Sequence, residues 1–173
     1  PMYAWHVKVD KFPDVKPTDI TEEERAHNLE MIRYVAKTCR DRGIELTIGV
    51  WQHLPWKESY VVSREDQISY VKGLDEKNVA EYTYLAVQKL LEECPGIARI
   101  QIRPNDESGI HLDDQTEFYR DNVMRAIKDS PSGAKLDLRL VGARESTVQA
   151  AREADLDVRT SQKFYGEFLA MPF

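Results

Sequence analysis

The sequence has little cysteine and no concentrated positive charge. Only two of the 173 residues are cysteines, Cys39 and Cys94, and a chain of this length can bury a core without disulfide or metal staples. Lysine and arginine total 24 against 30 aspartates and glutamates, for a net charge of -6, and the cations form no dense run. We therefore expect neither nucleic acid nor an anionic membrane surface as a partner, because both are bound through clustered cations.

Long apolar runs are also missing. The longest mostly apolar stretch, 44–51, is far shorter than the roughly 20 residues that cross a bilayer. The N-terminus shows no basic segment followed by an apolar one, so no signal peptide is visible in this chain. A hydrophobic fraction of 42% and a charged fraction of 31% are typical of a soluble globular protein, and they indicate one domain over 1–173. Neither the compartment nor the oligomeric state is indicated.

Two classes of binding motif are absent. No glycine-rich phosphate turn follows the first predicted strand, and GxxxxGK[ST] does not occur. A metal site would have to draw on His6, His53, Asp106 and His111, none of which has the tight spacing of HxH or HExxH. The prediction is therefore no cofactor and no metal.

An alternation of β-branched runs with amphipathic patterns is the strongest positive signal. Spacing predicts strands over 3–9, 44–50, 97–103, 136–141 and 156–160. It predicts helices over 22–42, 77–94, 117–128 and 146–153, with capping boxes at Thr21–Glu24 and at Ser146–Gln149 and a left-handed stop at Gly43. Both cysteines lie on the apolar sides of predicted helices, and we expect them to be buried thiols rather than a disulfide. This rhythm predicts an α/β fold with one parallel sheet.

Five βα units fit two architectures. One is a partial (β/α)8 barrel, which would be a segment of a larger catalytic domain, and the other is a five-stranded flavodoxin-like doubly wound sheet. The links from strand to helix are long, at 10–21, 51–76 and 104–116, whereas the links from helix to strand are short. In both architectures long loops at the carboxyl ends of parallel strands hold the ligand, so we expect the site at that edge.

An aromatic segment follows the second predicted strand. Trp51 and Trp56 flank Gln52 and His53, and indoles beside hydrogen-bonding groups suit the apolar face and hydroxyl edge of a sugar ring. The alternative is that both indoles only cover the rim of the sheet.

Acidic and basic residues follow the next three strands. Arg103 ends the third predicted strand, and Asn105, Asp106 and Glu107 follow it. A partly desolvated carboxyl group at this position can act as a general acid. The alternative is that the segment is a solvated turn. Arg144 and Glu145 follow the fourth strand, and Lys163 and Glu167 follow the fifth. Carboxylates from different strand ends suit glycoside hydrolysis. Arg103, Arg144 and Lys163 would neutralise an acidic sugar.

A family resemblance rests on these same residues. The run 105–109 (NDESG) after a strand, with Trp51-Gln52-His53 after the preceding strand and the aromatic stretch 163–173 downstream, resembles the middle of the barrel in glycoside hydrolases of the α-glucuronidase and related polysaccharide-degrading type. The resemblance spans the second to the sixth barrel unit, and the chain lacks recognisable first, seventh and eighth units. It implies a carbohydrate substrate, with Glu107 or Asp106 as general acid and Glu167 as its partner.

Two other functions stay open at this point. One is a divalent-metal-dependent sugar isomerase or aldolase barrel, and the other is a non-catalytic domain that holds a ligand or partner. On the hydrolase hypothesis Glu107 and Glu167 face a common space, and Trp51 or Trp56 exposes an indole to it.

Overall fold

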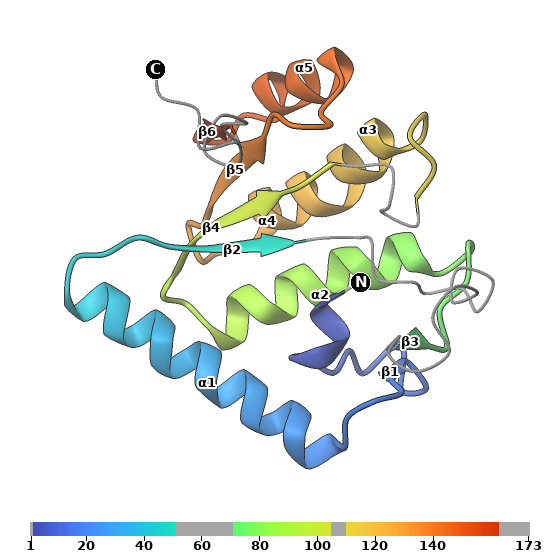
Figure 1. Ribbon diagram of the computed structural model, residues 1–173, viewed down its shortest axis with the longest axis vertical. Coiled ribbons are helices and arrows are strands. Elements are labelled where there is room, and N and C mark those ends of the chain that lie inside the picture. Colours follow the sequence, from blue (N-terminus) through green and yellow to red (C-terminus); the bar gives the residue numbers. More distant parts are fainter. Residues whose placement is uncertain (1, 51–70, 105–109, 163–173) are drawn as a thin grey trace, which may run out of the picture.

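A computed structural model of the chain describes residues 2–50, 71–104 and 110–162 and has an α/β fold (Figure 1). Its elements in chain order are η1 (Met2–Trp5), β1 (Lys16–Pro17), α1 (Glu22–Asp41), β2 (Leu46–Val50), β3 (Val71–Lys72), α2 (Val79–Glu93), β4 (Ile97–Ile102), α3 (Gln115–Phe118), η3 (Tyr119–Met124), α4 (Arg125–Asp129), β5 (Lys135–Arg139), α5 (Glu145–Glu153) and β6 (Val158–Ser161). The helix predicted over 117–128 is therefore one continuous run, α3–η3–α4, with a π-helical middle.

The main sheet has the order β2-β4-β5-β6, and every pair in it is parallel. These are four of the five predicted strands, in chain order, joined through helices. Figure 1 shows α1 and α2 toward the β2 side and α5 toward β6. A flavodoxin-like sheet reverses its strand order partway, and the four described strands do not.

The strand predicted over 3–9 is wrong. Residues 2–5 form a 3-10 helix, in which the carbonyl of Tyr3 accepts hydrogen bonds from the amides of His6 and Val7 at 2.9 Å. The side chains of Tyr3, Val7 and Val9 are buried in the core without a strand partner. The alternation of apolar residues therefore predicted correctly that these side chains are buried, but it did not predict the backbone conformation. A two-stranded antiparallel ladder of β1 and β3 was not predicted.

Local signals set the ends of α1 as expected. The hydroxyl of Thr21 accepts from the amide of Glu24, whose carboxylate accepts from the amide of Thr21. Gly43 has φ +70°, the left-handed conformation predicted for it. The capping box at Ser146 is wrong, because α5 begins at Glu145 and the Ser146 hydroxyl instead lies 2.9 Å from that of Thr116.

The core lies between the helices and one face of the sheet. Ile100, Ile102, Leu136 and Leu138 are fully buried there, in one cluster with the inner faces of α2 and of the α3–η3–α4 run. Cys94 is buried and Cys39 half-buried, and both are free thiols, as expected. Successive side chains of a strand point to opposite faces of the sheet. The residues between these apolar ones therefore lie on the face away from the core.

Candidate functional site

The face of the sheet opposite the core is almost entirely polar, and we call it the polar face. It presents Thr47 from β2, Arg99 and Gln101 from β4 with Arg103 just after it, Lys135, Asp137 and Arg139 from β5, and Arg159 and Ser161 from β6. The strand register arranges these residues in three rows that run across the sheet. The rows differ in their content of cations and carboxylates, and we use this difference to locate the candidate site.

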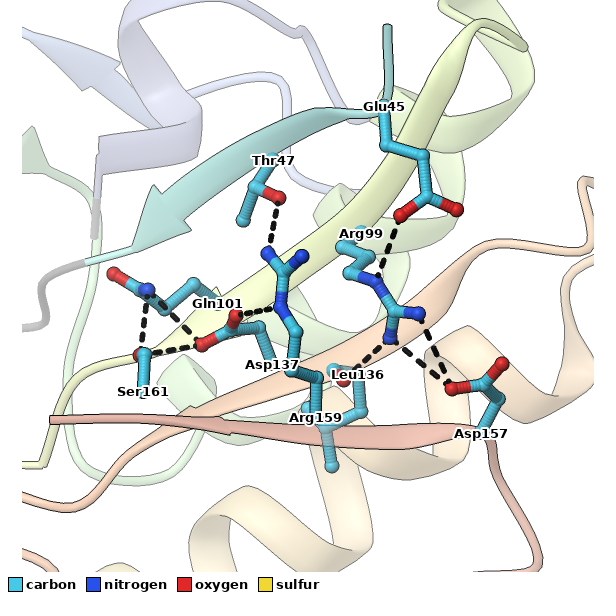
Figure 2. Close-up of polar contacts among 9 residues, drawn as sticks. All are labelled: Glu45, Thr47, Arg99, Gln101, Leu136, Asp137, Asp157, Arg159 and Ser161. Carbon is cyan, nitrogen blue, oxygen red and sulfur yellow. Dashed lines mark hydrogen bonds and ion pairs between the residues drawn. The ribbon is translucent and has the colours of Figure 1, made fainter.

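The row nearest the amino ends of the strands is an ion-pair network. The buried guanidinium of Arg99 lies 3.2 Å from Asp157 and 3.5 Å from Glu45, and it donates to the carbonyl of Leu136 at 3.2 Å (Figure 2). Lys135 lies 3.2 Å from Asp157 and 3.6 Å from Glu45. Two cations thus meet two carboxylates, and the row is neutral.

Asp137 is the centre of the middle row and is only 1% exposed. Its carboxylate accepts from the Ser161 hydroxyl at 2.7 Å, from Arg159 at 2.8 Å and from the Gln101 amide at 3.0 Å (Figure 2). Burial alone would raise the pKa of Asp137. The three hydrogen bonds and the charge of Arg159 outweigh burial, so its pKa lies below the ordinary value. With Arg159 opposite Asp137, this row is neutral as well.

Arg159 also shows that the sheet is curved. Its Nη2 donates to the hydroxyl of Thr47 at 3.2 Å, so β6 and β2, the first and last strands of the sheet, meet through their side chains (Figure 2). In a flat sheet three strand steps would separate the two backbones by about 14 Å, more than these side chains span. The sheet therefore curls toward its polar face.

The row at the carboxyl ends contains Arg103, Arg139 and Ser161. Ile102 is in register with Leu138, which places Arg103 beside Arg139, and Arg139 is in register with Ser161. Burial and the positive charge of Arg139 lower the pKa of Arg103. The three described members of this row include two cations and no carboxylate. Gly49, on β2 in register with Gln101, packs closely here: a Cβ there would lie 3.3 Å from Oε1 of Gln101 and 3.5 Å from Cδ of Arg103.

The structure places only part of the predicted site. Arg103 lies on the polar face, half-buried. Arg144 follows β5 but pairs with Asp113 at 2.6 Å, and Glu145 is exposed at the start of α5; neither is in a row of the polar face. The other predicted residues lie outside the described residues: Trp51, Gln52, His53, Trp56, Asn105, Asp106, Glu107, Lys163 and Glu167.

The histidines do not form a metal centre in the described part. His6 is half-buried beside η1, where burial lowers its pKa, and His111 is 74% exposed beside Asp113. Within residues 2–50, 71–104 and 110–162 no three His, Cys, Asp or Glu side chains gather as metal ligands.

Sequence reasoning missed Asp137, Arg139 and Arg159. Their signal was nevertheless present, since Asp137 and Arg139 alternate with leucines in β5, and Arg159 is flanked by Val158 and Thr160 in β6. A central parallel strand that helices cover on both faces has a continuously apolar sequence. Alternation in a parallel strand therefore indicates that only one face meets the hydrophobic core.

Comparisons with protein-family models, with curated proteins and with solved structures gave no match. No helix in the described part of the chain is long and apolar enough to span a membrane.

Proposed function

We propose that the protein is a (β/α)8-type, glycoside hydrolase-like domain that binds an acidic carbohydrate at the carboxyl ends of its parallel strands. The observation that carries the proposal is the arginine pair of the carboxyl-end row. In the two rows beneath it the described cations pair with carboxylates, and the arginine pair lies at the edge where parallel α/β folds hold their ligands.

Three features of the sheet support the barrel assignment. Its strands follow chain order, its apolar face meets the helices, and it curls toward the opposite face. Parallel barrels fill their interior with layered side chains, each layer coming from alternate strands, and in a barrel the side chains of the polar face would contribute to such layers. In this arrangement Arg103 and Arg139 point toward the mouth of the barrel.

A carboxylate is the ligand group that this row fits. Guanidinium groups bind carboxylates through paired, charge-assisted hydrogen bonds, and Arg139 supplies such a group at this edge. The reaction would use carboxyl groups of the loops that follow β4 and β6, with Glu107 or Asp106 protonating the leaving oxygen and Glu167 acting as base or nucleophile. That assignment rests on the family resemblance of the sequence.

Calorimetric titration with methyl glucuronide and methyl glucoside, which differ at one carboxylate, tests the proposal. We expect the glucuronide to bind at least tenfold more tightly, because a charged hydrogen-bonded pair contributes about 1.5–3 kcal/mol. Arg139→Gln should remove the preference. Arg152→Gln, an exposed arginine of α5, is the matched control and should leave it unchanged. Equal affinity for the two sugars, or binding of neither, would refute the proposal.

Turnover distinguishes the remaining functions. Release of methanol from methyl glucuronide, a poor leaving group that needs protonation, would support hydrolysis if it is unaffected by a chelator and is depressed by Glu107→Gln far more than release from an activated aryl glucuronide. Isomerisation that a chelator abolishes would instead indicate the metal-dependent alternative. Binding without any product would indicate a non-catalytic domain.

A further inference from the structure

A group of four buried polar atoms among the helices has no hydrogen-bond partner in the described part of the chain. The atoms are the hydroxyls of Tyr3, Tyr82 and Tyr119 and Nη1 of Arg25. Tyr3 is 2% exposed, Tyr82 and Tyr119 are 1% exposed, and Arg25 is 4% exposed. Buried polar atoms in native proteins nearly always have a partner, because leaving one unpaired costs a large share of the stability of a small domain.

The three tyrosines come from elements that pack against one another. Tyr3 lies in η1, Tyr82 in α2 and Tyr119 at the start of η3, and α2 contacts both η1 and η3 (Figure 1). Burial raises the pKa of Tyr3, and the charges of Tyr119 and Tyr82 raise it further. The three hydroxyls therefore lie within range of one another's charge, yet none donates to another. They are near neighbours without direct hydrogen bonds.

Neighbouring aromatic rings hold two of these tyrosines in place. The ring of Tyr82 meets Phe12 edge to face, with centroids 5.9 Å apart, and the ring of Tyr119 meets Phe118 in the same way at 5.8 Å. Edge-to-face contacts are favourable beyond the area they bury. Because the rings are fixed within the core cluster, a partner has to come to the hydroxyls.

Arg25 approaches the same group from α1. Its Nη2 pairs with Glu22, which is 64% exposed, whereas its Nη1 is buried and unpaired. Burial raises the pKa of Tyr82, and the charge of Arg25 offsets part of that rise, so the guanidinium lies near the Tyr82 hydroxyl. The charge of Arg25 is balanced by the Glu22 carboxylate, and the group of four atoms as a whole needs hydrogen bonds rather than a counter-charge.

We propose that bound water bridges the hydroxyls of Tyr3, Tyr82 and Tyr119 and Nη1 of Arg25, forming a buried water site in the helical layer. A phenol hydroxyl both donates and accepts, as water does, and a buried water molecule makes about three hydrogen bonds to groups that lack other partners. A bound anion fits less well. Since Glu22 already balances Arg25, an anion would add an unbalanced charge to the core, where desolvation of an ion is costly.

The water site fastens the N-terminal segment 2–9 to the helices. This segment pairs with no described strand, and the amides of His6 and Val7 donate to the carbonyl of Tyr3 within the segment itself. Bridging water connects Tyr3 to α2 and η3, and so supplies polar attachment where a sheet ladder is absent. The site lies on the core side of the sheet and needs no carbohydrate.

Single hydroxyl deletions test the proposal. Tyr82→Phe and Tyr119→Phe keep the packed rings, and each should raise the unfolding equilibrium constant about fivefold or more, because the water and the other hydroxyls lose a hydrogen bond. Urea denaturation measures this constant. In the double variant the combined effect should be smaller than the product of the two, since both hydroxyls bind the same water. Tyr34→Phe is the matched control: Tyr34, in α1, is 64% exposed, and loss of its hydroxyl should leave the constant unchanged.

Two further measurements report on the water and on the segment. Relaxation dispersion of the water oxygen nucleus detects water held inside a protein, and its amplitude should fall in the double variant while the circular dichroism spectrum stays the same. The amides of His6 and Val7 should exchange faster in Tyr119→Phe, although Tyr119 lies far from them in the sequence.

Unchanged or higher stability in both single variants would overturn the proposal, because removal of a truly unpaired buried hydroxyl costs nothing. Equal water relaxation in the wild type and the double variant would also overturn it. Chloride that stabilises the wild type but not the double variant would assign the site to an anion instead of water.

Discussion

Asp137 joins three of the four strands of the sheet through one carboxylate. It is almost fully buried, and its three hydrogen-bond donors come from β4 and β6. Substitution of Asp137 would leave these donors without their shared acceptor, and a buried group that loses its partner is costly. The stability of the polar face therefore depends on this residue more than on the exposed ion pairs of the helices, which contribute little.

Asp137→Asn should lower the free energy of unfolding by about 2 kcal/mol, because the amide keeps the shape but removes the charge opposite Arg159 and turns one acceptor into a donor. Urea denaturation followed by circular dichroism measures the loss. The matched control is Asp155→Asn, since Asp155 is 88% exposed and has φ 56°, a conformation that asparagine tolerates; the change should stay within about 0.5 kcal/mol. Equal effects of the two substitutions would mean that the network is energetically unimportant.

At the scale of elements, α1 is positioned by a close backbone contact. A Cβ on Gly96, in the turn between α2 and β4, would lie 2.7 Å from the carbonyl oxygen of Ala36 in α1. Only glycine therefore allows α1 to lie this close to the sheet.

Gly96→Ala should push α1 away from the turn and cost about 1–3 kcal/mol, as expected for overpacking against a backbone that cannot move freely. Gly43→Ala is the comparison: its Cβ would meet nothing within 4 Å, although φ is +70°, so only the left-handed conformation is penalised, by about 1 kcal/mol. Thermal unfolding of both variants, with hydrogen exchange of α1 amides, distinguishes the two causes. A smaller loss for Gly96→Ala than for Gly43→Ala would contradict the close contact.

At the scale of the whole molecule, carboxylates with lowered pKa values predict sensitivity to acid. A hydrogen bond from Lys135 lowers the pKa of Asp157, and a hydrogen bond from Lys89 lowers that of Glu93. The pKa of Asp137 is lowered despite burial. Each such group stabilises the fold above its unfolded pKa, near 4, and loses that contribution as the pH falls through its folded pKa.

The free energy of unfolding should therefore decrease continuously between about pH 5 and pH 3, because the unfolded chain binds more protons than the folded one in that range. Urea midpoints measured across this range give the slope. Asp137→Asn removes one of these groups and should make the slope shallower. Stability that does not change between these pH values would show that the three carboxylates titrate alike in the folded and unfolded chain.

The sequence by itself determined the α/β class, the helices α1 and α2, the chain order of four strands and the buried state of Cys94, because these follow from periodicity, capping and the short links between neighbours. Only the tertiary structure decided three features: the backbone conformation of residues 3–9, the first residue of α5 and the curvature of the sheet. Tyr3, Val7 and Val9 bury their side chains whether or not their backbone pairs, and Ser146 contacts Thr116, a residue 30 positions away. Arg159 reaches Thr47 across 112 positions. Such contacts depend on how the strands fold over one another, and no local pattern in the sequence specifies that.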